Sequence, residues 1–407
     1  MAGRLLLRSI GHVAMCSLVL ISALGVGEGS LAGHGRVVLG DDVALTGTRC
    51  PSHVRTIHRI RSRLRVCGKI LRDSRGRKVR IFSLDDWPVT PTFSYRDIGN
   101  WGFNAVRLSV SWDALEPAPP THGADGKPVH AWDPTYLAQL DQAIAGFHSH
   151  GVAVILAMSQ HLWSPAFTNL EHGGRIFPTG AGMPAWLYPQ GGGLCEMVKA
   201  EKGFFIRGVG QSEFRAAWRF LAGRYARNPA VIGADMLNEP YDVLTSSYPC
   251  TAGATPKTMK LARFYEATGK SIHRANSHLL LMFQEQKSRR TKRWALTRKP
   301  VLPNSVFDMH LYAPSWDQGR DRLGAAYRRA AHWHLPVWVG EWTMYNRTTN
   351  MQDAFAKWQY SSKKTLAYCK EHGISWDVLG YGAGRFQKAT AIRTPKAGVL
   401  KTVRGGF

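Results

Sequence analysis

The segment VIGADMLNEP, residues 231–240, decides the predicted fold. Apart from one aspartate, its first seven residues are apolar or small, which is typical of a buried parallel strand. The strand then runs directly into a polar end that contains Glu239. A second segment, PVWVGEW at 336–342, repeats the pattern and ends on Glu341. Each segment therefore places a carboxylate where an apolar strand stops.

Short apolar strands alternate with amphipathic helices on both sides of these segments. A hairpin of 64–71 and 77–82 around the turn 73–76 comes first, and 159–210 is predicted as one long loop. The predicted strands are 79–84, 104–110, 152–158, 231–237, 279–284, 305–310, 336–341 and 373–378. The predicted helices are 134–149, 212–226, 257–276, 319–332 and 351–371.

This alternation predicts an α/β protein, a (β/α)8 TIM barrel with a basic N-terminal lead-in and long βα loops. A doubly wound open sheet is the alternative. The barrel is favoured because no glycine-rich nucleotide-binding turn follows the first strand. In addition, polar residues gather at strand ends, where the active sites of barrels lie.

The N-terminus resembles a secretory signal. Arg4 and Arg8 precede an apolar run at 12–26, and small residues follow it. A membrane anchor is the alternative, but the run is short for one. We therefore expect a signal peptide at 1–32, an irregular basic segment at 33–63 and a barrel domain at 64–407. The mature protein is expected to be secreted, extracellular and without a transmembrane domain.

The cysteine content adds to this expectation, because export permits disulfides. Five cysteines remain once the signal is removed, so at least one is left outside an intramolecular disulfide. The sequence contains no C-x-x-C or H-E-x-x-H pattern, so neither a metal nor another cofactor is predicted. Our expected arrangement is Cys50–Cys67, Cys195–Cys250 and a buried Cys369 on a helix.

The formal net charge is +25, with basic stretches at 55–80 and 287–299. Such charge attracts anionic polymers, acidic lipids and nucleic acid. No helix-turn-helix or ribonucleoprotein-type motif accompanies it, so specific nucleic-acid binding is not predicted. The charge favours a solvated basic face and makes anionic cell-envelope polymers the candidate partners.

Two carboxylates at one end of a barrel are the requirement for cleaving a glycosidic bond. One protonates the leaving oxygen, and the other attacks the anomeric carbon or activates water. In retaining enzymes the two groups lie about 5–5.5 Å apart. Two carboxyls this close do not easily both ionise, so one keeps its proton. Glu239 and Glu341 could each be a surface or ion-paired residue, but their shared placement favours catalysis.

At these residues the sequence resembles glycoside hydrolase family 5, the cellulase-type barrels, over roughly residues 65–378. That family carries N-E-P after its fourth strand and a glutamate after its seventh. The resemblance implies that Glu239 is the acid/base and Glu341 the nucleophile of a retaining mechanism without a cofactor. It also implies that Asn238 contacts the sugar 2-hydroxyl.

The resemblance extends to four further residues. Arg107 matches the family arginine that hydrogen-bonds the nucleophile, and such a guanidinium would keep Glu341 ionised. His310 and Tyr312 match the family H-x-Y, which implies that the tyrosine orients the nucleophile while the histidine lines the sugar site. Trp376 matches the aromatic platform beneath the sugar.

Several loop motifs are similar to the endoglycoceramidase-like members. That group usually shows D-M-H-Q-D-L after the third strand, whereas Ser159 stands here at the histidine position and both acids are replaced. His161 is close enough in sequence to occupy the vacated space. Only 31 residues follow Trp376 (407 − 376), too few for an appended β-sandwich, which argues against a sphingolipid substrate. The shared motifs are Leu71-Arg72-Asp73 with Gly76-Arg77, Ser111-Trp112 through Leu115-Glu116-Pro117, and Gly180 to Trp186.

The substrate class is a carbohydrate or glycolipid, with β-glucan, mannan, a glycolipid and a small β-glucoside all open. Two other functions remain as alternatives. One is a catalytically altered carbohydrate-binding barrel, and the other is a basic cell-envelope-binding protein. Glu285 is either a third site carboxylate or a surface ion-pair partner, and the second interpretation is favoured by the basic residues Lys287, Arg289 and Arg290 nearby. The long-loop aromatics Trp163, Phe167, Trp186 and Tyr188 either shape a cleft or pack the loop core.

Overall fold

The computed structural model describes residues 55–86, 95–172, 175–240, 244, 250–287, 293–344, 351–379 and 399–407. Residues 47–407 form one compact unit. The predicted signal peptide at 1–32 lies outside the described residues. In the part of the chain that is described, no helix is both long and apolar enough to cross a membrane.

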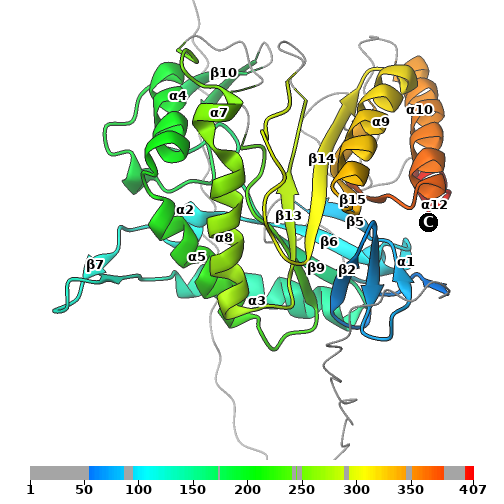
Figure 1. Cartoon of the computed structure of the whole chain (residues 1–407), viewed down its shortest axis with the longest axis horizontal. Helices are drawn as coiled ribbons and strands as arrows, with labels where there is room; N and C mark the ends of the chain where they lie inside the picture. The colour runs from blue at the N-terminus through cyan, green and yellow to red at the C-terminus, as the bar shows by residue number, and fades with distance from the viewer. Residues whose placement is uncertain are drawn as a thin grey trace, which may run out of the picture. The chain divides into compact units, whose positions relative to one another are not determined.

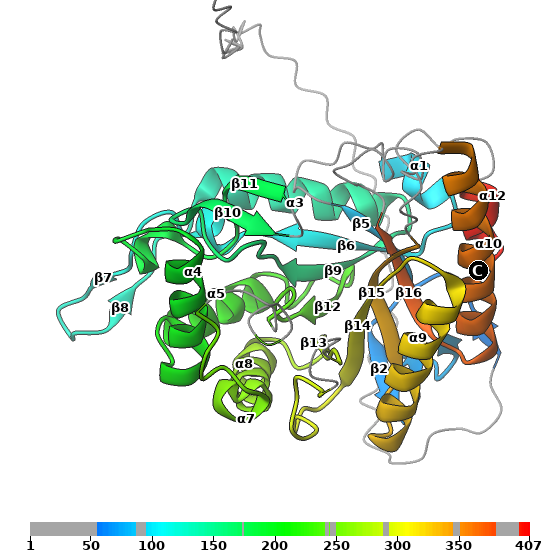
Figure 2. The ribbon, with the colours of Figure 1, turned by 90° about the horizontal axis from the view of Figure 1, so that it is seen from above.

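Eight parallel strands close into a barrel, with β5 paired to both β6 and β16, which confirms the predicted fold. In Figure 1 and Figure 2, helices from successive parts of the sequence surround the strands. All eight lie within a few residues of their predicted positions. They are β5 (Phe82–Asp86), β6 (Ala105–Val110), β9 (Ala153–Met158), β12 (Val231–Asp235), β13 (Leu280–Gln284), β14 (Ser305–Ala313), β15 (Val337–Met344) and β16 (Ser375–Leu379).

The outer helices begin and end where local signals place them. Asp133 caps α3 (Pro134–Ser149) by accepting a hydrogen bond from the backbone N–H of Tyr136 at 2.6 Å. The helix predicted at 257–276 is instead two, because Lys260 has a φ of 51° and interrupts it. The others are α1 (Tyr95–Asn100), α2 (Trp112–Leu115), α5 (Gln211–Arg224), α7 (Pro256–Met259), α8 (Leu261–Ala275), α9 (Trp316–His332), α10 (Met351–Glu371) and α12 (Val399–Arg404).

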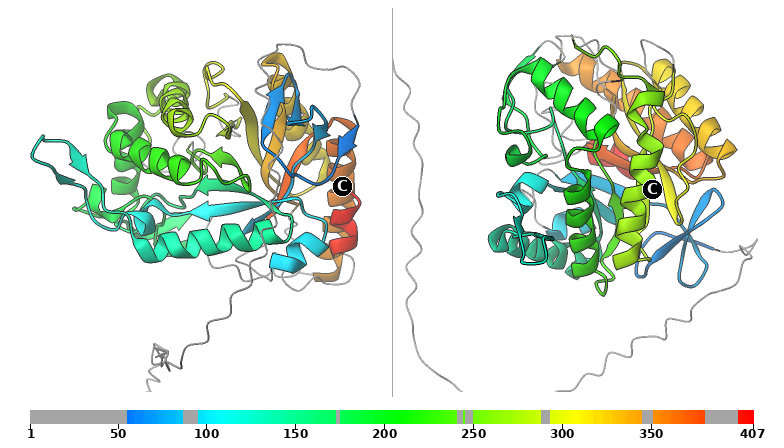
Figure 3. Two further views of the ribbon diagram at one scale, coloured as in Figure 1. Left: turned by 90° about the horizontal axis from the view of Figure 1, so that it is seen from below. Right: turned by 60° about the vertical axis from the view of Figure 1, so that its left-hand side comes forward.

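A small sheet lies beside the N-terminal ends of the barrel strands (Figure 3). Its strands are β1 (Thr56–Ile57), β2 (Leu64–Cys67), β3 (Ile70–Asp73) and β4 (Lys78–Val79), in the order β1-β4-β3-β2. The predicted single hairpin is therefore two, and β1 falls in a stretch predicted to be irregular. Apolar residues of this sheet share a buried cluster with the starts of the barrel strands, so this end of the barrel is filled.

The stretch 159–210, predicted as one loop, has its own secondary structure between β9 and α5. It contains β10 (Thr168–His172), β11 (Arg175–Thr179), the 3-10 turn η1 (Ala185–Leu187), α4 (Leu194–Lys202) and the π-helical turn η2 (Gly203–Arg207). Trp163 and Phe167 are 1% and 2% exposed. These two aromatic side chains therefore pack the core of the segment 159–210, which was one of the two roles considered for them, and do not line a cleft. A further hairpin of β7 (Thr121–His122) and β8 (Pro128–Val129) projects outward in Figure 2.

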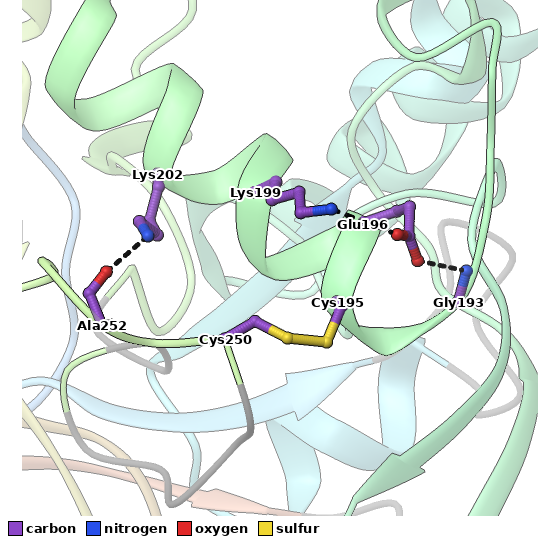
Figure 4. The surroundings of a disulfide bond; sticks show 7 residues. All are labelled: Gly193, Cys195, Glu196, Lys199, Lys202, Cys250 and Ala252. Atoms are coloured by element: carbon purple, nitrogen blue, oxygen red, sulfur yellow. Dashed lines mark hydrogen bonds and ion pairs between the residues drawn. A yellow bond between two sulfur atoms is a disulfide. The ribbon is translucent and has the colours of Figure 1, made fainter.

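The disulfide Cys195–Cys250 joins α4 to the segment that precedes α7, with its Cα atoms 5.6 Å apart (Figure 4). This confirms one predicted pair. Cys67 is also disulfide-bonded, but its expected partner Cys50 lies outside the described residues. Cys369 is buried and free, as expected.

Candidate active site

The two predicted catalytic glutamates come together where β12 has ended and in the C-terminal half of β15. One carboxylate oxygen of each, together with one ring nitrogen of His310, lie within 4.8 Å of one another. His310 and Glu341 are direct neighbours in the register of β14 and β15. This separation is close to the 5–5.5 Å of retaining glycosidases and too short to hold the water of an inverting one.

The two carboxylate oxygens of Glu341 are hydrogen-bonded by two different side chains. Arg107 Nη1 lies 2.8 Å from its Oε1, and the Tyr312 hydroxyl donates a hydrogen bond to its Oε2. His310 Nδ1 lies 3.4 Å from Oε2. The side chain is 10% exposed. A cation orients one carboxylate oxygen and a neutral donor orients the other, so the position of the Glu341 carboxylate is fixed.

Glu239 sits at a sharp turn, with a φ of 45°. Its backbone N–H donates to Gln284 Oε1 at 2.6 Å, and its Oε1 lies 2.7 Å from His310 Nδ1. Protein surrounds the carboxyl, yet 29% of the side chain is open to solvent. Burial raises the pKa of Glu239, but the hydrogen bond and positive charge of His310, with the charge of Arg107, leave that pKa below its ordinary value. This direction is unexpected for a general acid, and it depends on a charged His310.

Arg107 lies at the centre of the hydrogen-bond network of the site and is 1% exposed. Its Nε and Nη2 donate to Asp235 at 3.0 and 2.7 Å, and its Nη1 donates to Asp85 at 3.2 Å as well as to Glu341. Its Nη2 also donates to Asn238 Oδ1 at 2.8 Å. One guanidinium therefore fixes both the predicted nucleophile and the residue that precedes the predicted acid/base.

A layer of four buried aspartates lies on the barrel strands around Arg107: Asp85, Asp235, Asp308 and Asp377, each 1% exposed or less. Burial raises the pKa of Asp85 and of Asp308 to about 7, and it also raises those of the other two. The layer holds more negative charge than Arg107 neutralises, so part of it carries protons near neutral pH. This layer was not predicted, although single aspartates inside apolar strands are its signal in the sequence.

His310 is 5% exposed and stands between both glutamates. Burial lowers its pKa, whereas the negative charges of Glu341, Glu239 and Asp308 act to raise that pKa. Its Nε2 lies 2.7 Å from the amide nitrogen of Gln284. Gln284 was not predicted as a site residue, although it is the polar end of the apolar strand β13.

Asn238 is held by the protein itself. Besides accepting from Arg107, its Nδ2 donates to the carbonyl of Gln160 at 3.0 Å, so its contact with a sugar hydroxyl stays a prediction. Ser159 is 5% exposed, and its hydroxyl has no hydrogen-bond partner among the described residues. The His161 ring packs edge-on against Phe177 at 5.0 Å.

The structure does not bring Trp376 to the site, so its prediction as a sugar platform is wrong. Trp376 is 0% exposed and stacks on Phe407, with ring centres 5.5 Å apart, and it also packs against Phe82. Side chains alternate along a strand. Because Asp377 interacts with the layer inside the barrel, its neighbour Trp376 faces the outer helices.

Glu285 is also outside the site. It is fully buried, and its Oε2 accepts from Arg329 Nε at 2.9 Å. Burial raises its pKa to about 7. Glu285 is therefore an ion-pair partner and not a third site carboxylate, but the prediction of a surface pair with the basic residues nearby in sequence is wrong, because the partner comes from α9 and Glu285 is buried.

Comparisons with known proteins agree with this fold. The sequence matches the family described as Cellulase (glycosyl hydrolase family 5) over residues 76–380. A crystal structure of an endogalactoceramidase is 23% identical, covers 78% of this chain and 74% of its own, and gives a TM-score of 0.62. Endo-glycoceramidase II from Rhodococcus sp., in a cellobiose-like imidazole complex, is 18% identical, with 84% and 80% coverage and a TM-score of 0.60. The Pseudomonas stutzeri endoglucanase Cel5A is 12% identical, with 80% and 92% coverage and a TM-score of 0.51. No curated protein matches the sequence.

Proposed function

The chain belongs to glycosyl hydrolase family 5 and is a glycosidase with a TIM-barrel fold; from this premise we propose that it cleaves a β-glycosidic bond with retention of configuration. The observation that carries the proposal is the short separation of the two carboxylates, one oxygen of each lying within 4.8 Å of the other. That space admits an anomeric carbon between them but not an additional water.

Glu341 is the proposed nucleophile. Its carboxylate oxygen bonds to the anomeric carbon while the glycosidic C–O bond breaks and its electron pair moves to the leaving oxygen. Glu239 gives its proton to that oxygen in the same step. Water then attacks the anomeric carbon and passes a proton to Glu239, and the bond to Glu341 breaks. Arg107 and Tyr312 would support Glu341 in both its ionised and its departing state.

The substrate is a carbohydrate or glycolipid, as membership of the family implies. We propose a glycan or glycoconjugate and assign no single linkage. The segment 159–210 begins at Ser159, where the sequence departs from the family pattern. We propose that this segment determines which glycan or glycoconjugate the protein accepts.

We also propose that the protein is secreted. The disulfide Cys195–Cys250 supports this, since such bonds persist in oxidising compartments. The net charge of +25 further supports contact with anionic cell-envelope polymers. Binding to purified envelope that weakens with added salt would test this second point, and salt-insensitive binding would contradict it.

The catalytic proposal is tested on a panel of aryl β-glycosides, β-glucans, mannans and glycolipids. Glu341→Ala should abolish turnover. Glu239→Ala should regain activity with azide, a small anion that fits the vacated space, and the product should be the β-glycosyl azide. Glu371→Gln, which removes an exposed carboxylate on α10, is the matched control. An α-configured first product would contradict retention.

The alternative raised by the sequence, a catalytically altered carbohydrate-binding barrel, draws its support from Ser159, which stands at the usual histidine position. A wild-type protein that binds oligosaccharides in calorimetry but is inert on the whole panel would establish it. Turnover abolished by Glu341→Ala would exclude it.

A further inference from the structure

We propose that Gln284 holds His310 in its neutral form, protonated at Nδ1, and thereby keeps the transferable proton of the site on Glu239. This inference rests on the proposed glycosidase function and makes Gln284 a positioning residue. The geometry is a closed ring of three hydrogen bonds that joins the backbone of Glu239, the Gln284 amide, the His310 ring and the Glu239 carboxyl.

The direction of every hydrogen bond in this ring follows from one fixed donor. The backbone N–H of Glu239 can only donate, so the atom of Gln284 that faces it at 2.6 Å is the oxygen. The amide NH2 of Gln284 therefore faces His310 Nε2 at 2.7 Å. An NH2 group can only donate, so Nε2 must offer a lone pair. The ring proton of His310 is then on Nδ1, which donates to Glu239 Oε1 at 2.7 Å.

A doubly protonated His310 would break this ring. Its Nε2–H would point at the NH2 of Gln284, and two donors would face each other in a buried place. Turning the amide over would satisfy Nε2–H but would leave the N–H of Glu239 against an NH2 group. Either arrangement leaves a buried donor without an acceptor, which is unfavourable because Gln284 is 0% exposed and water cannot replace the lost partner.

The charges around His310 act in the opposite direction. Glu239 is in contact at Nδ1, Glu341 Oε2 lies 3.4 Å from Nδ1, and Asp308 Oδ2 lies 3.9 Å from Nε2. These carboxylates favour a charged ring and act to raise its pKa. The only one of them on the Nε2 side is beyond hydrogen-bond distance, whereas the Gln284 amide is in contact. Gln284 is thus the group that opposes the second proton, and the hydrogen-bond directions decide the tautomer.

A neutral His310 changes the protonation of the Glu239 carboxyl. With a neutral His310 the nearest positive charge disappears, and burial, the largest influence on this carboxyl, favours its protonated form. The acid proton then sits on Oε2, while Oε1 still accepts from His310 Nδ1. Glu239 can therefore act as an acid without any change in the observed contacts.

The first test needs no substrate. NMR of the full chain with isotope-labelled histidine reads directly whether His310 Nε2 carries a proton, and the signal is assigned with His310→Gln. We expect an unprotonated Nε2 near neutral pH. A proton on that nitrogen at pH 7 would overturn the inference, whatever the activity of the protein.

The second test uses Gln284→Glu. The introduced carboxylate can accept from both the Glu239 N–H and a protonated Nε2, so it keeps the backbone contact and charges the ring. Glycosides with a poor leaving group should then lose turnover by about 100-fold, a modest general-acid contribution. Dinitrophenyl glycosides, whose leaving group needs no proton, should change by less than about threefold.

The matched control is Tyr265→Phe. The Tyr265 hydroxyl contacts the Gln284 backbone N–H and carbonyl at 3.2 and 3.1 Å but not its amide, so this variant should not separate the two substrates. An equal loss on both substrates in Gln284→Glu would overturn the inference. An inert wild type would overturn the proposed function instead, while the NMR result would still decide the tautomer.

Discussion

Removing Arg107 should expose how strongly this site depends on one cation. Arg107→Met keeps a long unbranched side chain in the barrel but leaves Asp235, Asp85 and Glu341 without the guanidinium that contacts all three. Asp235 alone loses two hydrogen bonds, at 3.0 and 2.7 Å. Both groups of that pair are at most 1% exposed, so water does not replace the lost donor.

The magnitude follows from this burial. Deleting one partner of a buried ion pair costs about 3–5 kcal/mol, and three orphaned carboxylates place the variant at the upper end. The acids respond by taking up protons, so their pKa values in the folded state rise. A raised acid pKa leaves no penalty below the unfolded value of about 4, and the penalty grows as the pH climbs from there to the folded value, above which it is complete. The loss should therefore be larger at pH 8 than at pH 5.

Urea unfolding followed by tryptophan fluorescence at both pH values measures this. Arg77→Met is the control, because Arg77 is 33% exposed and pairs with a single carboxylate, Asp73, at 2.7 Å. It should cost at most about 1 kcal/mol. A loss below about 1 kcal/mol for Arg107→Met at pH 8, or an equal loss at pH 5, would refute the reasoning. In a kinetic profile of the same variant, the acid limb should move to higher pH.

Three further predictions concern stability and the corrected platform. Replacing Cys195 and Cys250 together by serine opens a loop of 55 residues and should lower the free energy of unfolding by about 4 kcal/mol; an unchanged urea midpoint would contradict this. Asp308→Asn keeps an acceptor for the backbone but removes a group whose pKa is raised to about 7. Wild-type stability should therefore fall more steeply than that of the variant between pH 4 and 7, by on the order of 1.4 kcal/mol per pH unit, and parallel curves would count against it. Trp376→Ala should cost about 3–5 kcal/mol of stability with KM unchanged, whereas weakened substrate binding at full stability would restore the platform role.

The strands and the two glutamates were predictable because their signals are local. Short apolar runs define the barrel, and a carboxylate at the end of such a run is visible in the sequence. Trp376 was misplaced because the matching motif gave its strand but not which face it lies on. One residue of register separates the inside of the barrel from the outside, and Asp377 occupies the inward position.

Other features depend on contacts between distant segments. The ring through Gln284 joins the ends of three strands, and no spacing within one segment predicts it. The partner of Glu285 is Arg329, 44 residues away, whereas the basic residues close in sequence had suggested a surface pair. The secondary structure of the segment 159–210 was not predicted because its strands and turns are short and its glycines are typical of loops.

The disulfide between α4 and the segment before α7 links two of the loops that border the active site. The first follows β9 and carries Ser159, and the second follows β12 and begins beside Glu239. Because a covalent bond ties them, neither can be exchanged alone for the loop of another barrel without leaving an unmatched cysteine. Any attempt to graft a new specificity onto this scaffold must transplant the two loops as one cross-linked cassette, and natural diversification of the site is subject to the same coupling.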